Sequence, residues 1–381
     1  MNLQKKSVAF LINEKIDKKH KLFKLCKELE KIYNIYYFVQ PTNKFKSINT
    51  KNIIYVNDLK KIEKNFFSLK IKYCFDNLWF PDHKNSNIRY RSILKKNYKL
   101  RDIFIKNKIP LIRFSFSNLS KWNKTPLKYL RIFKLLLKDI KNKFSLPKWL
   151  QIPNWNIVVA QGNFPMQHIN YFKSKLIYSH SLDYDQFIKS KDKKIKIKNY
   201  AVYIDQMIGE HPDNAIKSTS VNVKEKKFNE ELKSLFYKLK KNFSLKVKIS
   251  VHPKRKYFKN QELYGCKVNN RDTTYNLIKN SKLVLVHDSA AISFAVMFNK
   301  PIIFLVSDSI NNSFYLDRIK MYAAFFNTKS INISKNIDSL ISPKIYKIDK
   351  TTYKYFKDGT IKHPSSEKIK ISKQIEKALT F

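Results

Sequence analysis

The chain has 381 residues, of which 77 are Lys or Arg and only 29 are Asp or Glu, so its formal net charge at pH 7 is +48. Its hydrophobic fraction of 43% is enough for a large core and excludes a wholly disordered chain. No apolar run reaches the roughly 18–20 residues that a membrane-spanning helix requires. Three widely spaced cysteines, Cys26, Cys74 and Cys266, are typical of a reduced cytoplasm and exclude a cysteine-type structural zinc site.

The positive charge does not by itself indicate a nucleic-acid-binding protein. Only eight of the basic residues are Arg, the residue that nucleic-acid-reading proteins use for bidentate contacts, and Lys is spread over the whole chain. This composition is typical of a protein encoded by an AT-rich genome. We therefore expect no nucleic-acid partner. Attraction to an anionic membrane or to anionic substrates remains the alternative explanation for part of the charge.

The first half of the chain alternates between short apolar runs and segments of helical periodicity. Strands are expected at Ser7–Ile12, Ile35–Val39, Ile53–Val56, Lys72–Phe75, Ile157–Ala160 and Lys175–Tyr178, with a helix over Lys18–Tyr33. This alternation predicts a parallel sheet with helices on its faces. Residues 85–126 carry no clear pattern. Leu127–Phe144 is a basic amphipathic segment, which favours a helix packed on the sheet, with membrane-surface binding as the alternative.

The second half repeats the same alternation more regularly. The expected strands are Tyr200–Ile204, Leu245–Val251, Cys266–Val268, Leu283–Val286 and Pro301–Val306, and the expected helices are Glu225–Asn242, Thr273–Asn280 capped by Asp272, Ser289–Phe298, 310–325, 335–341 and Ser365–Leu379. The fold class is therefore α/β, with two Rossmann-like domains facing across a cleft, which is a common place for a ligand.

The domain boundaries follow from the composition. We expect an N-terminal domain over 1–187, a charged linker over 188–199, a C-terminal domain over 200–345, and a final segment over 346–381 whose helix packs back toward the first domain. We find no internal repeat.

The strongest candidate site lies where strands of the second domain end. In an open α/β sheet, ligands bind beyond the carboxyl ends of the strands, and both His252 and His287 follow a strand. The N-terminus of the helix over Ser289–Phe298 offers free N–H groups to a phosphate. The candidate nucleotide-binding residues are His252, Pro253, Lys254, Arg255, His287, Asp288, Ser289 and Ser293.

The run from His252 to Leu305 resembles the donor-binding domain of GT-B glycosyltransferases, in particular the bacterial capsule families that use CMP-activated acidic sugars, the polysialyltransferases and capsular Kdo transferases. Those families carry a His-Pro motif and a later Ser-rich motif, both of which contact CMP. His252-Pro253 matches the first motif. Asp288-Ser289 with Ser293 stands for the second, although Ala290 follows Ser289 where the families have Ser-Ser or Ser-Thr.

A second cluster follows the strand Tyr200–Ile204. It contains Asp205, Gln206, Glu210 and His211 around Gly209, a position where the backbone can approach a ligand closely. The resembled families have a strand that leads to a Gln and an acidic residue at this point. Asp205 is a candidate catalytic residue, and the other three are candidates for the acceptor side of the cleft.

A third cluster, at the end of the first domain, contains His180, Asp183 and Asp185. An inverting sugar transfer needs one base to take the acceptor proton, and His or Asp can do this. His180 and Asp183 are the catalytic candidates, and Asp185 is a cleft residue or a helix cap. No metal motif, P-loop or Gly-x-Gly-x-x-Gly sequence occurs, so we expect no metal and no cofactor.

These observations and the resemblance together imply a metal-independent, inverting glycosyltransferase that moves a CMP-activated acidic sugar, such as Kdo or a nonulosonate, onto a bacterial surface polysaccharide or lipid-linked glycan. Its expected location is the cytoplasm, with the cytoplasmic face of the inner membrane as the alternative. Its partners would be a nucleotide-sugar donor and a glycan or lipid-linked acceptor. The alternatives are a CDP-glycerol-type polyol-phosphate transferase, a UDP-sugar epimerase of similar fold, and a non-catalytic basic protein that binds nucleic acid or membrane.

Overall fold

The computed structural model describes residues 5–13, 21–39, 52–56, 59–78, 88–115, 147, 153–163, 174–189, 195–211, 221–253, 255, 262–268, 273–335 and 346–380. The chain divides into two compact units. Unit 1 combines Met1–Ile188 with Asp358–Phe381, and unit 2 is Lys189–Lys357. Among the described residues, no helix is long and apolar enough to cross a membrane.

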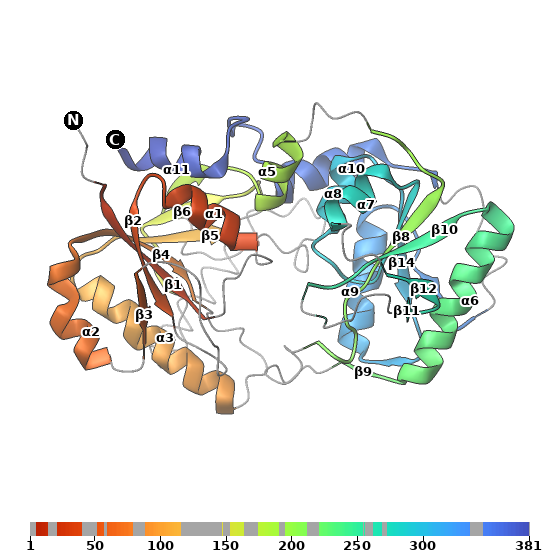
Figure 1. Ribbon diagram of the computed structural model, residues 1–381, viewed down its shortest axis with the longest axis horizontal. Helices are drawn as coiled ribbons and strands as arrows, with labels where there is room; N and C mark the ends of the chain where they lie inside the picture. Colours follow the sequence, from red (N-terminus) through yellow and green to blue (C-terminus); the bar gives the residue numbers. More distant parts are fainter. Residues whose placement is uncertain are drawn as a thin grey trace, which may run out of the picture. The chain divides into compact units, whose positions relative to one another are not determined.

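Unit 1 is built on a parallel sheet of seven strands in the order β3-β2-β1-β4-β5-β6-β7 (Figure 1). The strands are β1 Ser7–Ile12, β2 Asn34–Val39, β3 Ile53–Tyr55, β4 Ile71–Asn77, β5 Leu111–Ser115, β6 Ile157–Ala160 and β7 Lys175–Tyr178. Successive side chains of a strand point to opposite faces of the sheet. In β1, Val8, Phe10 and Ile12 therefore join one apolar core, while Ala9 and Leu11 join the other.

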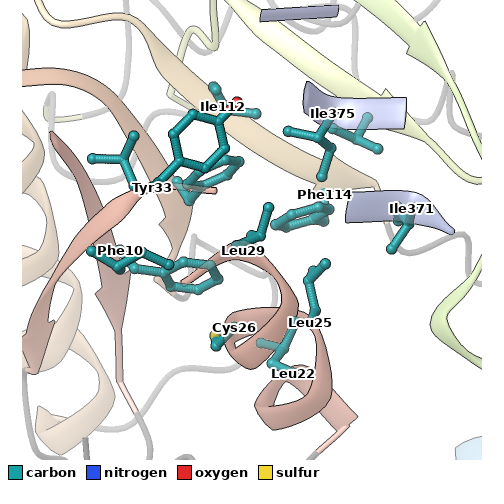
Figure 2. Close-up of a cluster of buried hydrophobic side chains, with 14 of the residues drawn as sticks. Phe10, Leu22, Leu25, Cys26, Leu29, Tyr33, Ile112, Phe114, Ile371 and Ile375 are labelled. Carbon is teal, nitrogen blue, oxygen red and sulfur yellow. The ribbon is translucent and has the colours of Figure 1, made fainter. Parts of the chain in front are cut away.

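Helices cover both faces of this sheet. They are α1 Lys21–Leu29, α2 Leu59–Asn65, α3 Ile88–Lys106, α5 Leu182–Lys189 and α11 Ile371–Thr380, with a 3-10 helix at Phe66–Leu69. Residues of α1 and α11 share one core with the sheet, and residues of α2 and α3 share the other. Figure 2 shows Ile371 and Ile375 of α11 beside Phe114 of β5 and Leu25 of α1.

The C-terminal segment is an integral part of unit 1. Gly162, which follows β6, lies so close to Gly359 that a Cβ on Gly162 would come within 2.4 Å of the Gly359 carbonyl oxygen. The Asn163 amide donates to the Asp358 carbonyl oxygen at 2.9 Å. Only glycine therefore allows this approach of two backbones, which fixes the point where the chain returns to unit 1.

Unit 2 has a parallel sheet of five strands in the order β10-β8-β13-β14-β16. The strands are β8 Tyr200–Ile204, β10 Lys246–Ser250, β13 Leu283–Val286, β14 Ile302–Val306 and β16 Ile331–Asn332. Two small antiparallel pairs join β9 Asn222–Val223 to β15 Ile310–Asn311 and β11 Glu262–Leu263 to β12 Cys266–Lys267. The helices are α6 Glu225–Phe243, α7 Thr274–Asn280, α8 Ile292–Met297, α9 Ser313–Phe325 and α10 Lys350–Phe356. A π-helical turn at Lys357–Ile361 then leads the chain into unit 1.

The predicted α/β class with two Rossmann-like domains is confirmed, and the apolar runs are strands as expected. Residues 85–126, which carried no pattern, contain α3 and β5. The expected helix over Leu127–Phe144 and the expected helix over 335–341 lie essentially outside the described residues. Helix α5 continues to Lys189, two residues into the segment that was expected to be a linker.

Helix α9 begins at Ser313 instead of at 310, because Ile310–Asn311 forms β15, and three further helix starts differ from the expectation. The cap of α7 is Thr273, whose side chain accepts a hydrogen bond from the Asn276 amide; Asp272 lies outside the described residues. The last helix begins at Ile371, six residues after the expected Ser365, because the Lys362 ammonium holds the preceding carbonyl groups in an irregular turn. The third difference, at α8, bears on the candidate site.

Candidate functional site

Four loops meet at the carboxyl edge of the unit 2 sheet. They begin at Asp205 after β8, at Val251 after β10, at His287 after β13 and at Ser307 after β14. Because these strands are parallel neighbours, the loops that follow them lie on one edge, where open α/β sheets bind ligands. Most of the sequence-predicted nucleotide and acceptor residues are therefore brought to this edge of unit 2.

The Asp205 carboxylate and the Arg255 guanidinium form the central ion pair. The Arg255 Nε lies 2.8 Å from Asp205 Oδ2, and the Asp205 side chain is only 1% exposed. Asp205 also accepts hydrogen bonds from the Met207 amide at 3.1 Å and from the Tyr264 hydroxyl at 3.2 Å. These contacts fix the orientation of the Asp205 carboxylate. The geometry therefore gives Asp205 a positioning role, in place of the catalytic role that the sequence suggested.

Arg255 is held by a second carboxylate. Its Nη1 donates to both oxygens of Glu210, at 2.8 and 3.1 Å, and its Nη2 reaches the Tyr264 hydroxyl at 3.4 Å. These contacts raise the pKa of Arg255 further above its ordinary value, against the opposing effect of burial. The guanidinium is thus permanently charged and fixed in direction.

The loop after β8 is tightly folded. Met207 has φ +51° and Gly209 has φ +90°, so two residues of the loop occupy the left-handed region. The glycine is suited to that conformation because it has no Cβ. The loop brings the His211 ring to 4.9 Å from the His252 ring, centroid to centroid, at an interplanar angle of 75°. Both rings are partly accessible to solvent, so they can contact a ligand.

His287 is unlike this pair. Its side chain is fully buried, its Nδ1 lies 2.8 Å from the Leu305 carbonyl oxygen, and its Nε2 has no hydrogen-bond partner among the described residues. Burial lowers the pKa of His287 to about 4, although the Leu305 contact and the charge of Asp205 act in the opposite direction. A neutral, inaccessible imidazole cannot neutralise a phosphate. The predicted nucleotide-binding role of His287 is therefore replaced by a packing role.

Asp288 and Gln206 connect the loops. The Asp288 carboxylate pairs with Arg318 Nη2 of α9 at 2.5 Å, and the Asp288 amide donates to Gln206 Oε1 at 2.7 Å. The pKa of Asp288 is raised above its ordinary value, because the effect of burial outweighs the opposing effect of Arg318. Gln206 therefore fastens the loop after β8 to the loop after β13, and Asp288 fastens the latter to α9.

The helix that was expected over Ser289–Phe298 is the six-residue α8, Ile292–Met297. Residues 289–291 form a turn, in which the Ile292 amide donates to the Ser289 carbonyl oxygen at 3.3 Å. Ser289 Oγ accepts from the Ala291 amide at 3.2 Å, and Ser293 Oγ donates to the Ala290 carbonyl oxygen at 3.0 Å. Both serines thus lie at the site edge, with hydroxyls engaged in stabilising the turn.

Of the remaining predicted residues in this cluster, Pro253 is exposed and Lys254 lies outside the described residues. The sequence did not single out Tyr264, Arg318 or Glu231. Tyr264 enters the site through its hydrogen bond to Asp205, and Arg318 through its ion pair with Asp288, both partners being far away in sequence. Glu231 of α6 is buried and accepts hydrogen bonds from the hydroxyls of Ser307 and Ser309, which fixes the loop after β14. In a chain poor in acids, a Glu on the buried face of a helix was the available signal.

The third predicted cluster belongs to unit 1. His180 is fully buried, with Nε2 2.8 Å from the Ile369 carbonyl oxygen and Nδ1 3.1 Å from that of Ser181. This ring cannot reach an acceptor hydroxyl, so His180 does not fit the predicted role of a base. Asp183 is buried in the first turn of α5. Asp185 accepts a hydrogen bond from the Ile371 amide at 3.2 Å and so caps the start of α11.

Among the residues that the structure describes, no group of three or more His, Cys, Asp or Glu side chains is arranged to hold a metal ion. The site described above is instead a set of ion pairs and hydrogen bonds that orient Arg255, His252 and His211 at one edge of a sheet.

No protein-family model matches the chain, and no curated protein matches it. A protein of Listeria monocytogenes assigned as a UDP-N-acetylglucosamine 2-epimerase is similar in structure, with a TM-score of 0.50 and 10% identity over 99% of this chain and 96% of that chain. The fold is of the GT-B type. Staphylococcus aureus MnaA with UDP has a TM-score of 0.49 and 14% identity over 99% and 96% of the two chains.

A variant of the wall teichoic acid polymerase TagF has a TM-score of 0.46 and 10% identity over 99% of this chain and 88% of that chain. At identities of this size, the likeness concerns the GT-B fold alone.

Proposed function

We propose that this protein is a nucleotide-sugar enzyme that binds the nucleotide phosphate at the carboxyl edge of the unit 2 sheet. The observation that carries the proposal is the joining of the edge loops, since Arg255 pairs with Asp205 and Gln206 pairs with Asp288. These contacts hold His252, Arg255 and Ser289 on one edge, where a phosphate meets a cation and N–H or O–H donors.

Sugar transfer from a nucleotide places negative charge on the phosphate that leaves. Preorganised positive groups lower the barrier to that step because they are aimed at the charge before it develops. Arg255 supplies a fixed positive charge, and the partly exposed His252 supplies a hydrogen-bond donor. The proposed mechanism therefore requires no metal ion to stabilise the leaving group.

The proposed base is His211. An acceptor hydroxyl loses its proton as it attacks the sugar, and histidine is suited to accept it near neutral pH. His211 is partly exposed and its ring packs edge-on against that of His252. Asp205 is neutralised by Arg255, and His180 is buried in unit 1, so His211 fits this role better than either.

The proposed donor is a CMP-activated acidic sugar, such as Kdo or a nonulosonate. Its support is the resemblance of His252-Pro253 and Asp288-Ser289 to the motifs of capsule transferases. The acceptor would then be a surface polysaccharide or a lipid-linked glycan at the cytoplasmic face of the inner membrane, where the basic charge of the chain favours contact with anionic lipids.

The second candidate function is that of a UDP-sugar 2-epimerase. The Listeria protein that shares the fold over nearly the whole of both chains is assigned this activity. The two candidates share the nucleotide site and differ in the fate of the donor. A transferase breaks the bond between sugar and phosphate and releases the nucleotide, whereas an epimerase returns an isomeric nucleotide sugar.

A thermal-shift screen with CMP, CDP, UDP and GDP tests the proposal. A ligand that binds only the native state stabilises it by RT ln(1 + [L]/Kd), which is about 2.7 kcal/mol at a hundredfold excess over Kd. We expect one of these nucleotides to raise Tm in the wild type. We expect His252→Ala to abolish that rise without changing the Tm of the unliganded protein, because His252 is not part of the core.

The chain offers a matched control in a His-Pro pair of unit 1, His363-Pro364, which is also accessible to solvent. His363→Ala should keep the full nucleotide shift. Equal shifts in both variants and the wild type, or no shift with any nucleotide, would contradict the proposed site. NMR of a reaction with the matching nucleotide sugar then separates a released nucleotide from an epimerised nucleotide sugar.

A further inference from the structure

Arg255 contacts two carboxylates of very different character. The Asp205 side chain is 1% exposed and takes the Nε side of the guanidinium, where the Met207 amide and the Tyr264 hydroxyl also hold it. The Glu210 side chain is 49% exposed and takes Nη1 with both of its oxygens. One contact is therefore buried and supported by further hydrogen bonds, and the other is open to solvent.

Glu210 is not needed to neutralise the charge of Arg255. The buried Asp205 carboxylate already neutralises the single positive charge of Arg255, so Glu210 adds a second negative charge to the cluster. Breaking a buried pair by removing one partner is costly, whereas an ion pair with a solvent-exposed partner contributes little. Of the two carboxylates, Glu210 is thus the one that can leave at low cost.

The position of Glu210 is the one that a ligand oxygen would take. Nη1 is a donor of the fork with which arginine binds carboxylates and phosphates. The Arg255 amide donates to the His252 carbonyl oxygen at 3.0 Å, so this guanidinium and the proposed phosphate ligand His252 belong to one short turn. The Glu210 carboxylate therefore stands where the oxygen of an anionic ligand would meet Arg255.

We propose that Glu210 is a built-in competitor, which occupies Nη1 of Arg255 in the unliganded protein and is displaced by the anionic group of the ligand. The displaced side chain moves into solvent from a loop whose backbone turn is kept by the Glu210 amide, which donates to the Met207 carbonyl oxygen at 3.0 Å. Asp205 keeps Arg255 oriented throughout the exchange. This inference rests on the proposed function, because it assumes that the phosphate binds at this edge of unit 2. What it adds is that Glu210 lowers the affinity for that phosphate.

Glu210→Gln tests the competitor, because it keeps the shape of the side chain and removes its charge. The probes are inorganic pyrophosphate and the nucleotide selected by the thermal-shift screen, with Kd measured by calorimetry at fixed ionic strength. We expect both probes to bind about two- to fivefold more tightly to the variant, which is the size of an exposed ion pair. The gain should shrink as salt is added, since screening weakens exposed charges.

Glu230→Gln is the matched control, because Glu230 is an exposed acid on α6 of the same unit and its replacement changes the net charge equally. It should leave both Kd values unchanged. If pyrophosphate binds no more tightly to Glu210→Gln than to the wild type, Glu210 is not a competitor, whatever the nucleotide does. If pyrophosphate affinity rises but no nucleotide binds either protein, the competitor stands and the nucleotide-sugar proposal fails.

Discussion

Two histidines that follow β10 and β13, the strands on either side of β8 in unit 2, show how strongly burial decides the chemistry of a side chain. His252 keeps contact with solvent and with the ring of His211. His287 is enclosed by Tyr203 and Phe228 and offers one nitrogen to the Leu305 carbonyl oxygen. The first ring is available to a ligand, and the second is a neutral part of the core.

The pH dependence of stability follows from His287. Burial lowers its folded-state pKa to about 4, below the ordinary value of 6.5. Between these values the unfolded chain binds a proton that the folded chain does not, so stability is present at pH 7 and is lost as pH falls from about 6.5 toward 4. The loss should total about 3 kcal/mol.

His287→Asn isolates this contribution, because the Asn amide can still donate to the Leu305 carbonyl oxygen but does not titrate. Native-state hydrogen exchange of β8 and β13 at several pH values measures the local stability of unit 2. The difference between the wild type and the variant should be constant above pH 7 and should narrow or change sign below pH 6. If the stability of the wild type and that of the variant change in parallel down to pH 4, His287 binds a proton equally well in the folded and the unfolded state, which would contradict the prediction.

At the scale of elements, α11 illustrates how a helix from the end of the chain covers one face of a sheet that is formed by the N-terminal part of the chain. Ile371, Ile375 and Leu379 are buried in the core that also contains α1 residues (Figure 2). Lys370 pairs with Glu28 at 3.1 Å, and the Tyr73 hydroxyl donates to the Leu379 carbonyl oxygen at 3.3 Å. The helix is therefore anchored by apolar contacts and by polar contacts at both ends.

Ile375→Ala should lower the free energy of unfolding of unit 1 by about 2–5 kcal/mol, since it leaves a cavity at a fully buried position. All four tryptophans of the sequence lie in unit 1, so their fluorescence in a urea titration reports this unit. Lys373→Ala on the exposed face of the same helix should change the value by no more than about 0.5 kcal/mol. Equal small effects of the two changes would mean that α11 does not complete the core.

At the scale of the whole molecule, the two units differ in how the chain builds them. Unit 2 is a continuous stretch, Lys189–Lys357, and all the proposed nucleotide ligands lie in it. Unit 1 is formed from two stretches, and the second of them returns through the contact of Gly162 with Gly359. Unit 1, which contains the N-terminal stretch, thus also requires the C-terminal segment Asp358–Phe381.

A chain that ends at Lys357 should therefore lose the structure of unit 1 and keep that of unit 2. The reason is that removal of α11 uncovers one face of the unit 1 core, whereas no strand of the unit 2 sheet is removed. Tryptophan fluorescence should become that of an unfolded chain, while hydrogen exchange in β8, β13 and β14 stays slow. Native-like fluorescence in the shortened chain would contradict the two-stretch construction of unit 1.

The sequence by itself determined most of the strands, because both faces of a parallel sheet are buried and each strand is therefore a local apolar run. It also determined that Asp205, His252 and Asp288 follow strands, which in a parallel sheet puts them at one edge. It did not reveal α3 and β5. The buried face of α3 carries Asn97 and Arg101, which break its apolar period.

Only the tertiary structure decided which charges meet and which rings are accessible. Asn97 and Arg101 are tolerated because Asn13, which follows β1, and Asp76 of β4 bind them. Arg255 is bound by Asp205 because β10 lies beside β8 in the sheet, a neighbourhood that no local pattern encodes. Burial of His180 and His287 likewise depends on segments remote in sequence. Charged and hydrogen-bonding side chains interact with groups that are close in space. Their partners are therefore determined by the order of the strands in each sheet and by the return of the C-terminal segment to unit 1.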